Sequence, residues 1–270
     1  MIVTLNDNEH IDRSFKNLFG VFLKRIYSEE KVFNDIRILN IYINKKVNGK
    51  KIEKLLPADV EAFLYSGNLQ NVKANTFKKY VPSESFLCNI CVNAFFKVLD
   101  VAKERSNDVR IALLDPEGYY FSLLEKLIFY SKDIAVISNN LKVYTGEQRR
   151  LMKNYGAAFF LNSSEEHLFN YNLIIAPKEI RRPIFLKKDS AVFTSCESKA
   201  SISGTVYYKY KFNKFLYLNE ILPAYIPQEL FLAALYDIYK IRKLSKIIPN
   251  YCFNGYKYLP VEDLIASKKL

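Results

Sequence analysis

The sequence predicts an α/β protein of two domains, the second of which contains a doubly wound parallel sheet. The prediction starts from residues 108–155, where two apolar runs of strand length, in DVRIALLD and KDIAVISNN, flank an amphipathic segment of helix length. This order indicates a β-α-β unit with parallel strands. Similar apolar runs recur in GAAFFLNSS, YNLIIAP and SAVFTSCES, so the strands alternate with helices or turns as a doubly wound sheet requires.

A long amphipathic helix is predicted ahead of this sheet. From residue 83 to 103, apolar residues recur at three- and four-residue steps, after Pro82 and before the polar stretch KERSND. Its apolar face is wide enough to be covered on more than one side. We therefore expect the helix to end a domain of residues 1–105 and to connect it to a domain of residues 106–270.

The first domain is expected to be a small α/β domain. Apolar residues at helical spacing and alternating isoleucines mark its elements. The predicted elements are a strand at 2–5, a helix at 14–33, a strand at 35–47 with a polar turn at Asn48-Gly49, and a helix at 58–65 after Pro57.

The second domain is expected to finish with an edge hairpin and a late helix that packs back on the protein. The alternating stretch TVYYKYKFNKFLYL at 205–218 predicts the hairpin. Pro227 begins a predicted helix of roughly 20 residues, which Pro249 ends. The helix has acid at its start and basic residues toward its end, the polarity that a helix dipole favours.

Charge and cysteine content narrow the classes of function. The chain has 270 residues, with 40 Lys and Arg against 28 Asp and Glu, so its net charge is +12. Because the lysines are spread along the chain, we expect nucleic-acid binding to be weak, insensitive to sequence and largely lost between about 50 and 200 mM salt. The cysteines are scattered, and the sequence has neither a signal-peptide pattern nor an uninterrupted apolar run of membrane length. We therefore predict a cytoplasmic protein with no membrane partner.

The order of the predicted domains is similar to that of a known enzyme family. The stretch YNLIIAP ends a predicted strand with Ala176 and Pro177. In this feature and in its overall order, the chain resembles the shikimate-dehydrogenase-like and related amino-acid dehydrogenases. The resemblance implies a substrate domain, a linking helix and a Rossmann-like, NAD(P)-binding domain in which Ala176 and Pro177 border the nicotinamide.

The turn after the first strand of the second domain differs from a working dinucleotide site. Such a site needs a GxGxxG pattern, which lets the pyrophosphate approach backbone amides at a helix start. Here the turn is LLDPEGYYFSLL, with Gly118 as its one glycine. Asp115 and Glu117 add negative charge, and Tyr119 adds bulk, where phosphates would lie. We therefore predict a degenerate site.

Three other features bear on a cofactor. Asn139 and Asn140 follow the second strand, where the family has an acid for the ribose, and they can bond a hydroxyl or cap a loop. Thr145 lies near the predicted start of the next helix, where it can help bind an anion or serve as the N-cap. S-adenosylmethionine carries no phosphate, so a methyltransferase is a further alternative even though its usual glycines are missing.

The sequence assigns no metal site and no catalytic residue. Cys88 and Cys91 have CxxC spacing but fall in a helical pattern, which favours core packing over a zinc or redox site. Cys196 follows a predicted strand end, and His167 is a candidate general base, but packing and surface positions are the simpler interpretations for them.

These observations lead to one expectation and two alternatives. We expect a cytoplasmic, Rossmann-like protein with a degenerate dinucleotide site that binds a small molecule or a protein partner in the interdomain cleft. The first alternative is an active NAD(P)- or S-adenosylmethionine-dependent enzyme with an atypical cofactor loop. The second is a basic nucleic-acid-binding protein.

Overall fold

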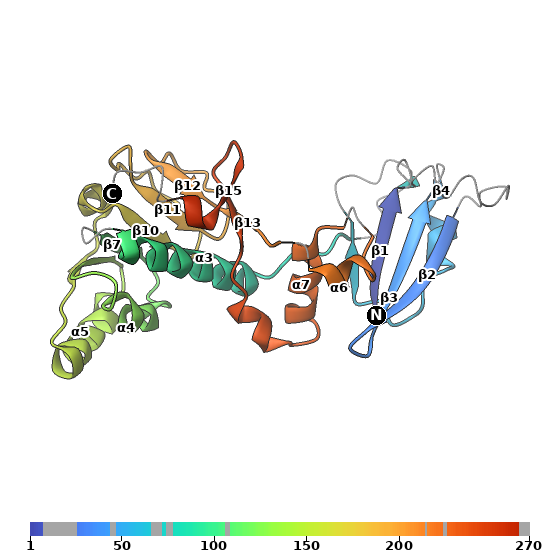
Figure 1. Cartoon of the computed structure of the whole chain (residues 1–270), viewed down its shortest axis with the longest axis horizontal. Helices are drawn as coiled ribbons and strands as arrows, with labels where there is room; N and C mark the ends of the chain where they lie inside the picture. Colours follow the sequence, from blue (N-terminus) through green and yellow to red (C-terminus); the bar gives the residue numbers. More distant parts are fainter. Residues whose placement is uncertain are drawn as a thin grey trace. The chain divides into compact units, whose positions relative to one another are not determined.

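The chain divides into two compact units, and each unit is made of two separate stretches of sequence. Unit 1 contains Met1–Ser83 and Lys214–Leu244, and unit 2 contains Glu84–Asn213 and Ser245–Leu270. Helices and strands are mixed in both units (Figure 1), which confirms the predicted α/β class. The computed structural model describes residues 1–7, 26–43, 47–65, 72–73, 78–105, 109–213, 215–223 and 226–264.

Unit 2 is built on a sheet of six strands in which every neighbouring pair is parallel. The strands are β7 (Arg110–Leu114), β8 (Asp133–Ile137), β9 (Phe160–Asn162), β10 (Leu173–Ala176), β11 (Ala191–Thr194) and β12 (Thr205–Tyr207). Their order across the sheet is β12-β11-β10-β7-β8-β9. Numbered along the chain from β7 and read from the β9 edge, this order is 3-2-1-4-5-6, so the succession of strands reverses direction between β7 and β10.

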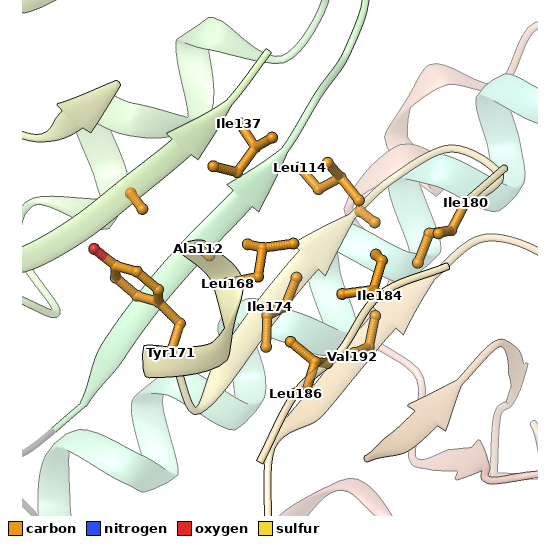
Figure 2. Close-up of a cluster of buried hydrophobic side chains, with 12 residues drawn as sticks. Ala112, Leu114, Ile137, Leu168, Tyr171, Ile174, Ile180, Ile184, Leu186 and Val192 are labelled. Carbon is orange, nitrogen blue, oxygen red and sulfur yellow. The ribbon is translucent and has the colours of Figure 1, made fainter. Parts of the chain in front are cut away.

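Both faces of this sheet are covered, which explains why its central strands are almost continuously apolar. On one face lies a cluster of buried side chains from the strands and their connections (Figure 2). On the opposite face lies helix α3 (Glu84–Arg105), the helix predicted at residues 83–103. Successive residues of β11 make the division clear. Val192 belongs to the cluster, while the ring of Phe193 contacts Phe95 of α3 with centroids 5.4 Å apart.

The remaining helices of unit 2 are short, apart from α5. They are η2 (Phe121–Leu123), α4 (Leu124–Leu127), α5 (Leu141–Tyr155), η3 (Glu165–Asn170) and η5 (Val261–Asp263). The β-α-β order predicted for residues 108–155 is therefore confirmed, although its first helical segment covers residues 121–127 alone. By length and composition, one helix of the described chain, at Glu84–Glu104, is apolar enough to cross a membrane. Because this segment lies within α3, whose apolar side chains pack on the sheet, the core helix of a soluble protein accounts for the same pattern.

A second, three-stranded antiparallel sheet in unit 2 replaces the predicted edge hairpin. It consists of β13 (Lys209–Lys211), β14 (Tyr251–Phe253) and β15 (Tyr258–Pro260). The hairpin expected at 205–218 is wrong because β12 joins the parallel sheet and β13 pairs with β14 instead. Two buried tyrosines hold this arrangement: the Tyr207 ring stacks on Phe193, and the Tyr210 hydroxyl donates to the Thr194 carbonyl at 2.8 Å.

Unit 1 contains a mixed sheet in the order β2-β3-β1-β5. Its strands are β1 (Ile2–Asp7), β2 (Ile26–Phe33), β3 (Ile36–Ile43) and β5 (Ala62–Leu64). Strand β1 runs parallel to β3 and β5, whereas β2 is antiparallel to β3. The other elements are β4 (Val47–Asn48), β6 (Val72–Lys73), α2 (Gly49–Glu53), α6 (Leu216–Asn219), α7 (Gln228–Asp237) and η4 (Arg242–Lys246), the last of which ends in unit 2.

Several predicted elements of unit 1 need correction. The strand predicted at 2–5 is confirmed by β1. The strand predicted at 35–47 is confirmed by β3 over residues 36–43, while residues 44–46 lie outside the described residues. The helix predicted at 14–33 is wrong at residues 26–33, which form β2, and residues 14–25 lie outside the described residues. Asn34 and Asp35 have φ of 45° and 66°, the left-handed pair that closes a tight hairpin between β2 and β3. The helix predicted at 58–65 is also wrong, because residues 62–64 form the strand β5 and the flanking residues form no helix.

The turn and the late helix were predicted at the right places but with the wrong extent. Asn48 is the N-cap of α2, and its side chain accepts the Lys50 N–H at 3.1 Å. Helix α7 begins after Pro227 as predicted but ends at Asp237, before a left-handed Lys240 (φ 56°). The predicted basic end of a longer helix is therefore not part of α7.

The predicted domain limits, 1–105 and 106–270, stay a prediction, but the compact units group two segments differently. Helix α3 belongs to unit 2 because it packs on β11, and α7 belongs to unit 1, where it contacts β5. The Asp237 carboxylate at the end of α7 accepts hydrogen bonds from the Tyr80 hydroxyl and from the N–H and hydroxyl of Ser83. These bonds join the two stretches of unit 1.

Candidate functional site

The candidate site of unit 2 lies at the carboxyl edge of the six-stranded sheet. Because the strands are parallel, the residues that follow each strand meet at one edge. The segments after β7, β8, β10 and β11 begin at Asp115, Ser138, Pro177 and Ser195. The reversal of strand order between β7 and β10 places Asp115 and Pro177 next to the point where open α/β sheets bind ligands.

The side chain of Asp115 is buried and organises the loop after β7. Its exposed fraction is 2%. Its carboxylate accepts the N–H of Gly118 at 3.2 Å and the N–H of Tyr120 at 2.7 Å, and it also accepts the hydroxyl of Tyr144 at 2.5 Å. In a dinucleotide site, amides of this first loop face the pyrophosphate. Here the protein's own carboxylate takes these two amides.

Gly118 holds the loop after β7 against the loop after β8. Its φ is +80°, and a Cβ at this position would lie 3.1 Å from the Cβ of Asn140. Two hydrogen bonds join the same loops: Asn139 N–H donates to the Pro116 carbonyl at 3.1 Å, and Asn140 Nδ2 donates to the Glu117 carbonyl at 3.4 Å. Asn140 is also the N-cap position of α5, without a side-chain capping bond. The predicted residues 118, 139 and 140 therefore do lie together.

An ion-pair cluster lies beside this loop. Lys178 Nζ is 2.6 Å from a Glu117 carboxylate oxygen and 3.7 Å from a Glu84 carboxylate oxygen. The same ammonium lies 4.4 Å from the centre of the Tyr119 ring, which is 64% exposed. The hydrogen bond to Glu117 raises the pKa of Lys178, so the lysine stays charged. Two carboxylates against one ammonium give this corner a net negative charge.

The residues after β10 are joined to α3 by a thiol. Ala176 and Pro177 are both buried, and the Pro177 carbonyl accepts a hydrogen bond from Cys88 Sγ at 3.0 Å. The hydroxyls of Tyr120 and Ser195 also form hydrogen bonds with the Cys88 thiol, but burial has the larger effect and raises its pKa. A buried, protonated thiol of this kind is a packing contact and not a nucleophile.

Three other predicted positions lie outside this arrangement. Thr145 does not begin a helix, because α5 starts at Leu141 and the Thr145 hydroxyl donates to the Leu141 carbonyl at 2.8 Å. The prediction of an N-cap at Thr145 is therefore wrong, and the alternative of an anion site there stays a prediction. Burial raises the pKa of the Cys196 thiol, which supports the packing interpretation. His167 is an exposed residue of η3, and its ring lies 5.1 Å from that of Phe160.

Sequence reasoning missed the residues that complete the site. Tyr144 and Lys178 both contact predicted site residues, yet neither was a candidate. The position of Lys178 directly after a strand end and a proline is a signal that could have identified it. In the described part of the chain, no group of three or more His, Cys, Asp or Glu side chains is arranged to hold a metal ion.

The chain was compared with known proteins. No protein-family model matches it, and a search of curated proteins finds no match. The resemblance to shikimate-dehydrogenase-like proteins is thus supported at the level of a parallel α/β sheet with helices. Its finer implications, a nicotinamide cofactor and a substrate domain, stay predictions.

Because Tyr144 is buried and bonded to Asp115, we expect its phenol to stay protonated when the folded protein is titrated to alkaline pH. Burial, and then the hydrogen bond to Asp115, raises the pKa of Tyr144 far above its ordinary value. In an unfolded chain the phenol ionises near pH 10, so its contribution to stability is complete below about pH 10 and is lost as the pH rises further. We expect absorbance titration of the folded protein at about pH 10.5 to count as many phenolates in Tyr144→Phe as in the wild type. One phenolate fewer in the variant would contradict the assigned contact.

Proposed function

We propose that unit 2 is a Rossmann-like ligand-binding module that does not use a nicotinamide dinucleotide. The order 3-2-1-4-5-6 of parallel strands supports this assignment, because it is the order of the doubly wound dinucleotide-binding sheet. The observation that carries the proposal is the buried carboxylate of Asp115 on the amides of Gly118 and Tyr120. A pyrophosphate at this loop would meet a buried negative charge in place of free donors.

The chemistry of the edge points to the class of ligand. Glu84 and Glu117 outnumber Lys178, so the corner favours a neutral or cationic ligand over an anion. The exposed ring of Tyr119 offers a stacking surface, and the amide side chains of Asn139 and Asn140 offer donors and acceptors for a hydroxyl. A small molecule with a ring and hydroxyl groups fits these features. The interdomain position of the site and the cytoplasmic location stay predictions.

Calorimetric titration of the full-length chain with NAD(H) and NADP(H) tests the proposal. We expect dissociation constants no tighter than about 1 mM, equivalent to about −4 kcal/mol. A micromolar constant for either nucleotide would overturn the proposal and favour an active dehydrogenase. Replacing Glu117 and Tyr119 together by glycine, which keeps the buried Asp115 carboxylate in place, should improve binding only modestly, because the loop after β8 still has no acid for the ribose.

S-adenosylmethionine is the second titrant, because its positive sulfonium and lack of phosphate suit the negative corner better. A micromolar constant for it would favour the methyltransferase alternative. Glu117→Gln is the matched variant, since this exposed change removes one negative charge and leaves the Asp115 hydrogen bonds intact. Binding of a cationic ligand at this edge should weaken in Glu117→Gln, whereas binding elsewhere should not change.

A further inference from the structure

The outer face of the three-stranded sheet in unit 2 combines aromatic rings with lysines. The register places Lys209, Phe253 and Tyr258 side by side across the sheet, and it places Lys211 beside Tyr251 in the next row on the same face. These five residues are called the aromatic-lysine face. The strands belong to the orange and red part of the chain in Figure 1. Side chains two residues apart along a strand share a face, so the grouping follows directly from the pairing.

The opposite face of the same sheet is buried, which fixes the orientation of the aromatic-lysine face. Tyr210 and Cys252 are neighbours across the sheet, with exposed fractions of 8% and 0%. Lys209 and Lys211, on either side of Tyr210 in the chain, are exposed, while Phe253 and Tyr258 are half-buried. The buried opposite face therefore fixes the strands that carry these rings, and the rings remain partly accessible to solvent.

The lysines of this face lie over its rings and are not neutralised by carboxylates. Lys209 Nζ is 5.3 Å from the centre of the Phe253 ring, and Lys211 Nζ is 4.0 Å from the centre of the Tyr258 ring. None of the ion pairs found between described residues includes Lys209 or Lys211. The carboxylate of Glu197 bonds the hydroxyl of the neighbouring Tyr208.

The hairpin between β14 and β15 extends the aromatic-lysine face. Asn254 orders the loop, because its side chain accepts the N–H groups of Tyr256 and Lys257 at 3.1 and 3.0 Å. The ring of Tyr256 is 94% exposed, an unusual position for a large aromatic side chain. The loop thus presents one more ring and one more ammonium to solvent.

We propose that the aromatic-lysine face and this hairpin bind single-stranded RNA. Bases stack on the rings, and the lysines turn from the rings to the phosphates. Base stacking on an aromatic side chain is stronger than an exposed cation–π contact, so a base can displace a lysine from its ring. An open antiparallel sheet face with accessible rings is the arrangement by which proteins bind unpaired RNA bases. The positive charge of the face matches the phosphate chain and opposes docking of a basic protein.

This binding should differ in one respect from what the diffuse charge of the sequence predicts. Contacts made by lysines alone disappear as salt rises, whereas stacking on rings is much less sensitive to salt. We therefore expect part of the affinity to persist at about 200 mM salt. The proposal is independent of the ligand site at the carboxyl edge of the six-stranded sheet, and each can fail without the other.

Fluorescence anisotropy of the full-length chain with a labelled, unstructured oligoribonucleotide of about 8 nucleotides tests the proposal. The ring variants Phe253→Leu and Tyr258→Leu keep apolar bulk and should each weaken binding by ~5-fold or more, with no change in salt dependence. Tyr256→Ala should weaken binding as well, and because this side chain is 94% exposed, the change should leave the fold intact. The double variant Lys209→Gln/Lys211→Gln should lower the slope of log K against log salt by ~1.4, the value for two phosphate contacts on a single strand.

Matched controls separate this surface from general basicity. Lys50→Gln/Lys51→Gln removes the same charge from two exposed positions of helix α2 in unit 1, and Phe185→Leu removes an exposed ring elsewhere in unit 2. Neither should change the affinity by more than about 2-fold. Equal losses in the controls, or no RNA binding at about 50 mM salt, would overturn the proposal. Tighter binding of a deoxyoligonucleotide or of an RNA duplex than of the single-stranded RNA would overturn the choice of RNA.

Discussion

Replacing Phe95 with alanine should lower the free energy of unfolding by about 3–5 kcal/mol, the usual cost of deleting a fully buried phenyl ring. Phe95 is 0% exposed, and its ring packs edge-on against Phe193 at a centroid distance of 5.4 Å. Phe193 in turn stacks on Tyr207. The cavity left by Phe95→Ala would lie at the end of this row of rings, at a fully buried position, so neighbouring side chains cannot easily close it.

Chemical denaturation of the full-length chain measures this effect, and Phe96→Ala is its control. Phe96 is the next residue of α3, carries the same side chain and is partly exposed. Its replacement should cost clearly less. A loss well under 1 kcal/mol for Phe95→Ala would mean that α3 does not hold the core of unit 2.

The same variant tests whether α3 also stabilises unit 1, as its predicted role as a connector implies. Hydrogen exchange in strand β3 reports on unit 1, and exchange in β10 reports on unit 2. Faster exchange in both strands would support the prediction that α3 connects and stabilises both units. A fragment that begins at residue 106 lacks α3, so it should not unfold cooperatively. A fragment as stable as the intact chain would contradict this expectation.

Removing the carboxylate of Asp115 should also be strongly destabilising, by about 3–5 kcal/mol for Asp115→Ala. The change leaves the N–H of Tyr120 and the hydroxyl of Tyr144 without their acceptor, and it takes one of two acceptors from the N–H of Gly118, which also donates to the backbone carbonyl of residue 115. Each buried donor that loses its partner costs about 1–3 kcal/mol. Because two of the donors are backbone groups, the loop after β7 should lose its conformation as well.

A double-mutant cycle with Tyr144→Phe separates the hydroxyl bond from the rest of the loop. We expect a coupling energy between the two positions of about 1–3 kcal/mol in denaturation experiments. Glu117→Ala, an exposed change in the same loop, should be close to neutral. Additive losses for Asp115→Ala and Tyr144→Phe would show that the bond contributes nothing to stability.

The six-stranded sheet was predictable because its strands leave a clear pattern. Strands buried on both faces must be apolar at nearly every position, as RIALL of β7 and LIIA of β10 are. Strand β2, IYSEEKVF, has no fully buried residue, so nothing in its composition set it apart from the helical spacing before it. The Asn34-Asp35 pair was the one local signal of the hairpin.

The candidate site was predictable in position but not in its interactions. The loop after β7 and the end of β10 follow from the strand pattern alone, so Asp115 and Pro177 could be identified. The role of Asp115 depends on Tyr144, which lies 29 residues away in the sequence. That contact is set by the start of α5 at Leu141, one turn earlier than the sequence suggested. Local sequence therefore indicated a negative charge at this loop but not the hydrogen-bond donors that stabilise it.

The division of each unit into two stretches of sequence has a consequence for how the protein is made. The chain passes from one unit to the other after Ser83, after Asn213 and after Leu244. During synthesis the six parallel strands emerge before β14 and β15, which pair with β13. Unit 1 likewise waits for α7 before its carboxylate at Asp237 can bond Tyr80 and Ser83. A ribosome that stops near residue 213 thus releases a product in which both units are incomplete, and a cut at any single point cannot separate them into whole parts.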